Sequence, residues 1–320
     1  SRFLALHRRN AGITATVIHD VKPDHIFVWS QLRLTLGASE TAEASGIPVS
    51  YTFNDDHPAG FLARPLTTDV PGWPGAIADR LLRRTRLNAL QLARTTCISE
   101  TLRLDLLARG VPVERTRVIH QGIPLERFAP LLERPRGATL RVLYAGQLHA
   151  YKGVHTLLEA APLLVAAGAP PFEISIAGEG GPEYTKRLRD LALAAGVTVR
   201  FLGRVPHGEI PSLYRTHDLF VFPSIWREPF GLTHLEAMAS GTPVVSTTEG
   251  GPGEFLDDGV NALTFEASNP HSLAYALLRL ARDQGLAGTL ARNARAMVET
   301  RFSLDRYVSD LEAFLQERAA

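Results

Sequence analysis

The chain has 320 residues, of which 45% are hydrophobic and 21% are charged, and its formal charge is +1. This length predicts two folded domains with substantial cores, and the balanced charge argues against a nucleic-acid-binding protein. The single cysteine, Cys97, excludes an internal disulfide; no Cys/His cluster has zinc-ligand spacing, and no apolar run approaches the ~18 residues of a membrane span. The opening residues, SRFLALHRRN, lack a signal-peptide pattern, so we expect a cytoplasmic enzyme.

The first half of the chain alternates strands and helices irregularly. Strands are predicted at residues 25–28, 49–53, 95–98 and 117–120, with a helix near residues 34–45. A basic helix is expected to begin at Ile77 and end at Arg94. Its arginines are interpreted as a solvated face; the alternative is peripheral contact with the inner face of an anionic membrane. The proline-rich and charged residues 124–136 are the predicted linker.

The second half repeats strand, loop and helix more regularly. Strands are predicted at residues 140–145, 172–177, 198–202, 219–222 and 243–246, and helices near 154–167, 183–195, 209–216 and 231–240. Strands that are apolar throughout and separated by helices predict a parallel sheet covered on both faces. Such sheets bind ligands at the carboxyl ends of their strands. A final helix is predicted behind Ser303, because one apolar stripe follows it.

Two glycine-containing loops follow the first two strands of this half. The loop GQLHAYKG, residues 146–153, opens a helix, where free N–H groups, the helix dipole and the charge of Lys152 favour a phosphate. A tight turn explains the glycines equally well. The loop GEGGP, residues 178–182, is of the same kind but lacks the G-x-G-x-x-G spacing of a dinucleotide site.

The segment SIWREPFGLTHLEAMASGTPVV, residues 224–245, places Glu228 before a helix and Glu236 inside it. The helix rises roughly 7 Å from Gly231 to Glu236, so both carboxylates can face one pocket with backbone N–H groups at its mouth. A carboxylate that accepts two vicinal hydroxyls is a usual way to hold a ribose or a sugar. The alternative is that both are exposed acids near a helix start, where the dipole favours them.

This segment resembles the retaining glycosyltransferases of family 4. Their mark is the pattern E-x-F-G-x-x-x-x-E-A-x-A-x-G-x-P-V-V, which appears here from Glu228 to Val245. The opening G-x-L-x-x-x-K-G at residues 146–153, FLGRV at 201–205 and LFVFPS at 219–224 agree with it. The likeness covers about residues 90–320 and is weaker over residues 24–60.

The resemblance implies an α/β protein of the GT-B fold, in which two Rossmann-like domains with parallel sheets face a cleft. Residues 1–136 would form the acceptor domain, residues 137–302 the nucleotide-sugar-binding domain, and residues 303–320 a helix that crosses back to the first domain. No Asp-x-Asp motif is present, in keeping with a metal-independent transferase that needs no cofactor.

The resemblance also implies roles for single residues. Lys152 would hold the donor diphosphate and Glu228 the donor sugar, as the catalytic residues, while Glu236 would accept the ribose hydroxyls. The other residues expected to bind the donor are Gln147, Gly178, Val205, Phe230, Gly231, Leu232 and Thr233. Among these, Val205 would pack on the base near Gly178, and the backbone of residues 230–233 would support the diphosphate and sugar.

Three departures from the family pattern are visible. Gln147 stands where the family usually carries an arginine on the diphosphate. Asn54, with Asp55 and His57 nearby, stands where a histidine is common. Nothing before His25 resembles the family's first strand and glycine-rich loop, so we expect a shortened or truncated first domain, or a second chain that supplies this segment.

The expected function is transfer of a sugar from a UDP- or GDP-linked donor, with retention, to an acceptor hydroxyl. The acceptor could be a small molecule, a glycan or a lipid-linked sugar, and nucleic acid is not an expected partner. One alternative is a sugar-nucleotide-binding protein with little or no turnover. A GT-B epimerase or phosphorylase fits the glutamate pair less well.

Overall fold

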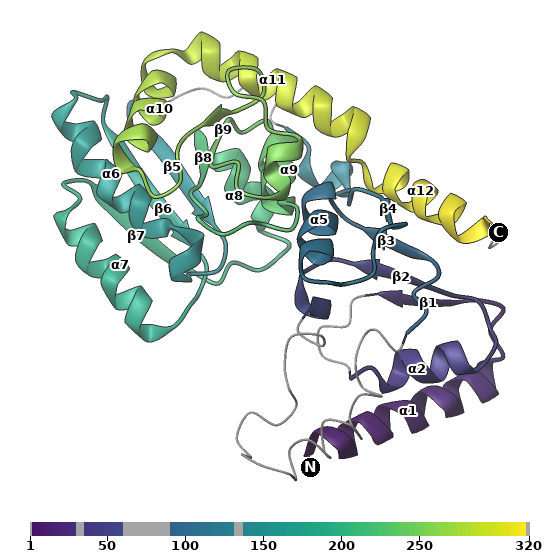
Figure 1. Ribbon diagram of the computed structural model, residues 1–320. Coiled ribbons are helices and arrows are strands. Elements are labelled where there is room, and N and C mark those ends of the chain that lie inside the picture. Colours follow the sequence, from purple (N-terminus) through teal and green to yellow (C-terminus); the bar gives the residue numbers. More distant parts are fainter. Residues whose placement is uncertain (1, 30–34, 60–89, 131–136, 318–320) are drawn as a thin grey trace. The chain divides into compact units, whose positions relative to one another are not determined.

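The computed structural model describes residues 2–29, 35–59, 90–130 and 137–317. The chain divides into two compact units, both α/β (Figure 1). Unit 1 is Ser1–His120 together with Asp310–Ala320, and unit 2 is Gln121–Ser309. Each unit contains one parallel sheet, which confirms the α/β class expected from the sequence.

Unit 1 has a four-stranded sheet in the order β1-β2-β3-β4. Its strands are β1 (Ile26–Trp29), β2 (Val49–Phe53), β3 (Thr95–Cys97) and β4 (Arg117–Val118), and its helices are α1 (Arg2–Val21), α2 (Gly37–Ala44), the short η1 (His57–Ala59) and α5 (Glu100–Ala108). Ser99 begins α5, because its hydroxyl accepts the N–H of Leu102. The four predicted strands are confirmed, with ends that shift by up to two residues.

The structure of unit 1 differs from the sequence prediction in one segment, and a second predicted segment lies largely outside the described residues. The sequence predicts no element before His25, where the structure places α1. Residues 77–89 of the predicted basic helix lie outside the described residues, and residues 90–94 are not helical. The predicted membrane contact through this helix therefore stays a prediction.

The last helix, α12 (Leu304–Gln316), begins in unit 2 and ends in unit 1. Its predicted apolar stripe buries Tyr307, Leu311 and Phe314. In unit 1, Arg117 donates to the carboxylate of Glu317 at 2.9 and 3.0 Å, which fixes the end of this helix to the sheet.

Unit 2 has a six-stranded sheet in the order β10-β9-β8-β5-β6-β7. The strands are β5 (Leu140–Ala145), β6 (Phe172–Ala177), β7 (Thr198–Gly203), β8 (Leu219–Phe222), β9 (Val244–Ser246) and β10 (Leu263–Thr264). The helices are α6 (Val154–Ala166), α7 (Pro182–Ala194), α8 (Ile210–Thr216), α9 (Leu232–Ala239), α10 (Pro270–Arg282) and α11 (Gln284–Arg301). Helices α6, α7 and α10 cover one face, and α8 and α9 cover the other (Figure 1).

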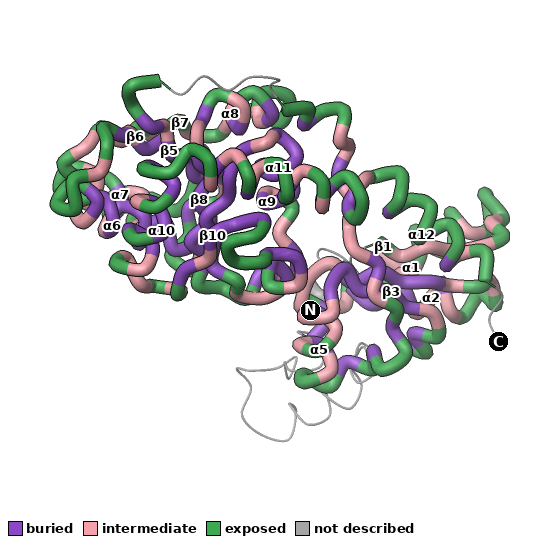
Figure 2. Tube along the Cα trace, turned by 90° about the horizontal axis from the view of Figure 1, so that it is seen from above, coloured by how far each residue is buried: buried purple, intermediate pink, exposed green. Residues whose placement is uncertain are grey.

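The order of the strands locates the ligand-binding edge of unit 2. After β5 the chain adds β6 and β7 on one side, then returns to place β8 on the other side of β5. Ligands of doubly wound sheets bind at such a reversal, at the carboxyl ends of the strands. All residues of β8 are buried (Figure 2), as are those of β9, so the loops that follow these strands are anchored in the core.

Part of the predicted linker is a short helix. Residues 125–128 form the short helix η4 (Leu125–Phe128), and Phe128 packs against Tyr214 with ring centroids 6.4 Å apart. This segment therefore belongs to unit 2, because a buried aromatic side chain fixes it there. The predicted domain boundaries at residues 136 and 302 stay a prediction.

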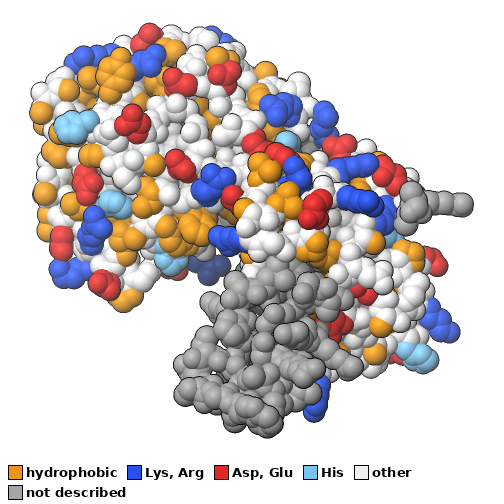
Figure 3. All heavy atoms as spheres, viewed as in Figure 1, with side chains coloured by type: hydrophobic (Ala, Val, Ile, Leu, Met, Phe, Trp, Pro, Cys, Tyr) orange, Lys and Arg blue, Asp and Glu red, His pale blue; other side chains and the backbone are white. Residues whose placement is uncertain are grey.

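On the visible surface, acidic and basic side chains are interspersed rather than gathered by sign (Figure 3).

Candidate functional site

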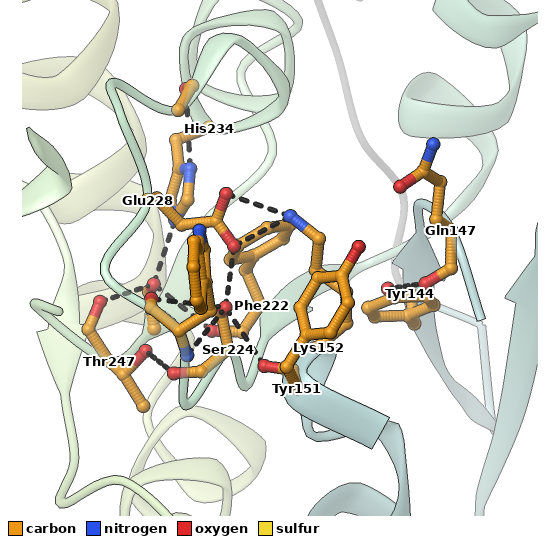
Figure 4. Close-up of polar contacts among 12 residues, drawn as sticks. Tyr144, Gln147, Tyr151, Lys152, Phe222, Ser224, Glu228, His234 and Thr247 are labelled. Carbon is orange, nitrogen blue, oxygen red and sulfur yellow. Dashed lines mark hydrogen bonds and ion pairs between the residues drawn. The ribbon is translucent and has the colours of Figure 1, made fainter. Parts of the chain in front are cut away.

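Lys152 and Glu228 form an ion pair at the carboxyl ends of the neighbouring strands β5 and β8. The Lys152 Nζ atom lies 2.7 Å from Oε1 and 2.8 Å from Oε2 of Glu228 (Figure 4). Only 15% of the Lys152 side chain and 9% of the Glu228 side chain are exposed. Charged groups this deeply buried need a partner, since the loss of their hydration is costly.

Gly153 allows the two loops that carry this pair to meet. Lys152 ends the short helix η5 (Ala150–Lys152), and Gly153 then takes a positive φ of 67° to start α6. A Cβ atom at Gly153 would lie 1.9 Å from the carbonyl oxygen of Pro223. A side chain here would therefore separate Lys152 from the loop of Glu228.

Glu228 is also held from its own loop. The Ser224 hydroxyl donates to Glu228 Oε1 at 2.5 Å, and Thr247 donates to the Ser224 carbonyl at 2.6 Å. The backbone of Glu228 pairs with the segment after β9, since Gly251 N–H donates to its carbonyl at 2.7 Å. The sequence analysis missed Ser224 and Thr247; the position of Ser224 directly behind the apolar strand of LFVFPS was the available signal.

Helix α9 presents its N-terminus beside these loops. Gly231 precedes it with a φ of 116°, and no side chain caps the helix. The first N–H groups of a helix, here those of Leu232 and Thr233, have no acceptor inside the helix and carry its positive dipole end. Such a terminus favours a bound anion.

The buried side chains of Phe230 and His234 anchor the start of α9 in the core of unit 2. Phe230 is buried, with its ring centroid 5.6 Å from that of Phe255. His234 is fully buried, and its Nε2 lies 2.8 Å from the Ser246 hydroxyl. Burial lowers the pKa of His234 to about 3, so the ring is neutral at physiological pH.

A cavity of about 360 Å³ lies beside the same helix. It is lined by Ala145, Gly146, Arg204, Val205, Pro206, His207, Ile210, Tyr214, Thr233 and Glu236. Tyr214 donates to Glu236 Oε2 at 3.1 Å. Burial raises the pKa of Glu236 to about 7, against the opposing effects of this hydrogen bond and of the charge of Arg127.

The cavity unites some of the predicted residues and leaves others out. Val205, Thr233 and Glu236 line it, as a common site requires. Glu228 is not among the lining residues, and the expectation that both carboxylates face one pocket stays a prediction. Lys152 and Ser224 hold the Glu228 carboxylate in place.

The alternative interpretation of the two glutamates as exposed acids is wrong. Glu228 is 7% exposed, and Glu236 is half-buried with a raised pKa. Exposed carboxylates near a helix start would have neither property.

Two further predicted residues, Gly178 and Gln147, lie in the loops that follow β6 and β5. Gly178 has a φ of 144°, and a Cβ atom there would lie 1.8 Å from the Gly146 carbonyl, so this glycine lets the loops after β5 and β6 touch. Gln147 is exposed, and Figure 4 shows its amide apart from Lys152 and Glu228. Its backbone carbonyl accepts the Tyr144 hydroxyl at 2.8 Å.

The residues predicted in the first domain directly follow β2 in the chain of unit 1. Asp55 Oδ1 accepts the backbone N–H of His57 at 3.0 Å, which orders the start of η1. The side-chain oxygen of Asn54 is buried and has no hydrogen-bond partner in the described part of the chain.

Two findings bear on metals and membranes. Within the described ranges, no group of three or more His, Cys, Asp or Glu side chains could hold a metal ion. None of the helices in those ranges is long and apolar enough to cross a membrane.

Comparison with known protein families gives two matches. Residues 134–297 match the family model of the glycosyl transferases group 1, and residues 3–127 match the model of glycosyltransferase family 4.

Three curated relatives illustrate the range of similar sequences. A putative glycosyltransferase of Bacillus subtilis, YtcC, is 30% identical over 69% of this chain and 59% of its own length. A D-inositol 3-phosphate glycosyltransferase of Salinispora arenicola is 35% identical over 74% and 54%. A glycogen synthase of Mycobacterium tuberculosis is 36% identical over 60% and 46%. The chain thus spans about half the length of the curated relatives it matches.

Two solved structures share the fold. The Anabaena protein Alr3699/HepE, solved with UDP and glucose, is similar with a TM-score of 0.74 at 22% identity, over 96% of this chain and 82% of that one. Sucrose-phosphate synthase of Thermosynechococcus elongatus has a TM-score of 0.74 at 22% identity, over 97% and 77%. The predicted GT-B fold is therefore confirmed.

Proposed function

The chain belongs to the glycosyl transferases group 1, and from this membership and the geometry of unit 2 we propose that it transfers a sugar from a nucleoside-diphosphate sugar to an acceptor hydroxyl. The proposal includes retention of the anomeric configuration and independence of a metal ion. The main observation in its support is that three features suited to a nucleotide sugar lie along one edge of the sheet of unit 2. A cavity with a half-buried carboxylate, a helix N-terminus and the largely shielded lysine–glutamate pair all lie there.

The cavity is the proposed nucleoside end of the site. Val205 and Pro206 offer an apolar wall for the base, and Glu236 faces the same space. When ionised, the Glu236 carboxylate accepts hydrogen bonds from the two ribose hydroxyls, since Tyr214 occupies only part of its acceptor capacity.

The N-terminus of α9 and Lys152 are the proposed diphosphate end. The N–H groups of Leu232 and Thr233 attract phosphate oxygens. An ammonium group has three donors, and Lys152 uses two on Glu228, which leaves one for the diphosphate. These fixed positive groups stabilise the charge that develops on the departing diphosphate, the task that a metal ion performs in other transferases.

Glu228 orients the transferred sugar and does not attack it. Its Oε1 already accepts from Lys152 and Ser224, and its Oε2 accepts from Lys152. The remaining acceptor capacity of Oε2 suits a sugar hydroxyl, while the paired charge is a poor nucleophile. This supports attack of the acceptor on the same face of the sugar from which the diphosphate departs, with a diphosphate oxygen taking the proton.

UDP is the first nucleotide to test, because the structurally similar Anabaena protein was solved with UDP and glucose. The experiment incubates the protein with a panel of UDP- and GDP-linked sugars and measures free UDP or GDP, with the Lys152→Ala variant as control. Release that depends on Lys152 supports a transferase. Binding of a nucleoside diphosphate without any release, over the full panel and with sugar and alcohol acceptors, supports the binding-protein alternative.

A further inference from the structure

Two exposed aromatic side chains lie beside the Lys152–Glu228 pair. Tyr151 follows β5 and is 40% exposed, and Trp226 follows β8 and is 41% exposed. Their ring centroids are 5.7 Å apart, and the rings are inclined by 52°. His149 stacks on Tyr151 with centroids 5.1 Å apart and an angle of 14°.

The two loops hold these rings in place. The Tyr151 carbonyl accepts the N–H of Ile225 at 3.0 Å. The N–H of Trp226 donates to the Ser224 hydroxyl at 3.3 Å. Ser224 therefore connects the backbone of Trp226 to Glu228, and the bond between Ile225 and Tyr151 joins the two loops, so the surface is organised together with the ion pair.

The exposure of these rings is unusual for unit 2. Its other site aromatics, among them Tyr144, Phe222 and Phe230, are buried. In the described part of unit 2 one further large aromatic side chain is at least as exposed, Tyr275, and it lies on α10 rather than in the loops that carry the ion pair. Exposed aromatic surface thus coincides with the proposed site of chemistry.

The charges beside the rings indicate what kind of molecule they fit. The Lys152 Nζ atom lies 5.5 Å from the centre of the Tyr151 ring, and the carboxylate of Glu228 is bonded to that same nitrogen. A sugar ring has an apolar face of C–H groups and an edge of hydroxyls. Its C–H groups pack against the electron-rich face of an aromatic ring, and its hydroxyls bond to nearby charged groups. A purely apolar ligand would leave those charges without hydration.

We propose that Tyr151 and Trp226 form a stacking surface for a sugar ring whose hydroxyls reach the Lys152–Glu228 pair. This inference rests on the proposed function and specifies the substrate chemistry next to the diphosphate end. The ring belongs either to the donor, as the sugar that is transferred, or to an acceptor that is itself a carbohydrate. The chemistry of the contact is the same for both, and they are distinguished by experiment.

The test compares Trp226→Ala and Tyr151→Ala with wild type, and uses Tyr275→Ala as the control because it removes a still more exposed aromatic ring elsewhere in the same unit. Calorimetry measures binding of UDP and of UDP-glucose. Kinetics with UDP-glucose measure KM for maltose and for glycerol, a sugar and a non-sugar acceptor. GDP and GDP-mannose replace the uridine ligands if the donor panel selects guanosine.

Loss of one stacking contact is expected to change affinity about tenfold. If the surface holds the donor sugar, the variants bind UDP as wild type does but bind UDP-glucose about tenfold more weakly. If it holds an acceptor sugar, KM for maltose rises about tenfold while KM for glycerol and the affinity for UDP-glucose do not change. Tyr275→Ala leaves all values at the wild-type level.

The proposal is overturned if both variants match Tyr275→Ala in every value, or if they weaken UDP and UDP-glucose equally. Wild-type protein that binds neither UDP nor GDP would instead overturn the proposed function itself. The two failures are therefore distinguishable in one set of titrations.

Discussion

The surroundings of Glu228 and of Glu236 show how two carboxylates of one sequence motif acquire different properties. Glu228 is bonded to the Lys152 ammonium through both oxygens and accepts the Ser224 hydroxyl as well. Glu236 accepts a hydrogen bond from the neutral Tyr214 instead, and burial raises its pKa to about 7. The first environment maintains a paired charge, whereas the second creates an acceptor that titrates near neutral pH. We infer different tasks: Glu228 fixes the reacting end of the donor, and Glu236 holds the ribose.

Removal of Lys152 is expected to have the largest effect, because it eliminates the paired environment. Lys152→Ala leaves Glu228 buried without its cation and should cost about 3–5 kcal/mol of stability. It should also lower the transfer rate by about 10²- to 10³-fold, since the departing diphosphate loses its positive partner. Urea unfolding and donor turnover measure the two effects. Lys186→Ala is the matched control, because Lys186 forms an exposed pair with Asp190 on α7, and it should change neither value noticeably. Wild-type turnover in Lys152→Ala would contradict the assignment.

Removal of the Ser224 hydroxyl tests whether the orientation of Glu228 matters in addition to its charge. Ser224→Ala deletes the 2.5 Å hydrogen bond to Oε1 but keeps Lys152 in place. We expect a stability loss of about 1–2 kcal/mol and a roughly tenfold lower kcat, with unchanged affinity for the nucleoside diphosphate. Ser272→Ala is the control, because it removes the hydroxyl of a half-buried serine on α10, elsewhere in the same unit. An equal loss in kcat and in nucleotide affinity would show that Ser224 acts on the whole site.

The pH dependence of nucleotide binding tests the second environment. The pKa of Glu236 is raised from 4.5 to about 7, so the folded protein binds this proton more tightly than the unfolded chain. The stabilisation by protonated Glu236 is therefore present below pH 4.5 and is lost as the pH rises through about 7. Relative to Glu236→Gln, wild-type stability should fall over this window in urea unfolding.

Nucleotide affinity should change in the opposite direction. The ionised carboxylate accepts both ribose hydroxyls, so wild-type affinity for the nucleoside diphosphate should rise about tenfold with ionisation. In Glu236→Gln the corresponding rise should be absent, apart from the titration of the ligand phosphate that both proteins share. Parallel pH profiles from calorimetry would disprove the role of Glu236 in ribose binding.

Gln147→Arg is expected to have the smallest effect. Gln147 is exposed and apart from the ion pair, so an arginine there would add a solvent-screened charge near the diphosphate. Nucleoside diphosphate should bind about two- to fivefold more tightly, and the gain should shrink in high salt. Gln147→Met controls for side-chain size. Calorimetric affinity that is unchanged or weaker would contradict the position given to this residue.

The sequence predicted the elements of unit 2 better than the contacts between them. Strands β5, β6 and β8 begin and end as predicted: β8 is apolar and buried throughout, and β5 and β6 are buried at every position except the second. Lys152 and Glu228 were identified one by one, yet their bond to each other was not. They are 76 residues apart and meet only because β8 returns to the side of β5, which no local pattern encodes.

The other missed features also depend on tertiary structure. The raised pKa of Glu236 results from burial, and the hydroxyl of Ser224 finds its acceptor only when the loops are folded. In unit 1 the helix α1 was not predicted: its less exposed positions recur at helical spacing, but several of them carry polar side chains, among them His7, Asn10 and Thr14.

The most direct test of the account compares a nucleoside with its diphosphate in two variants. Calorimetry measures binding of UDP, and displacement of UDP measures binding of uridine, in wild type, Lys152→Ala and Glu236→Ala; guanosine and GDP take their place if the donor panel selects them. We predict that Glu236→Ala weakens both ligands by the same factor, whereas Lys152→Ala weakens UDP about tenfold or more and leaves uridine unchanged. Equal losses for both ligands in Lys152→Ala, or no loss for uridine in Glu236→Ala, would contradict the division of the site between these two residues.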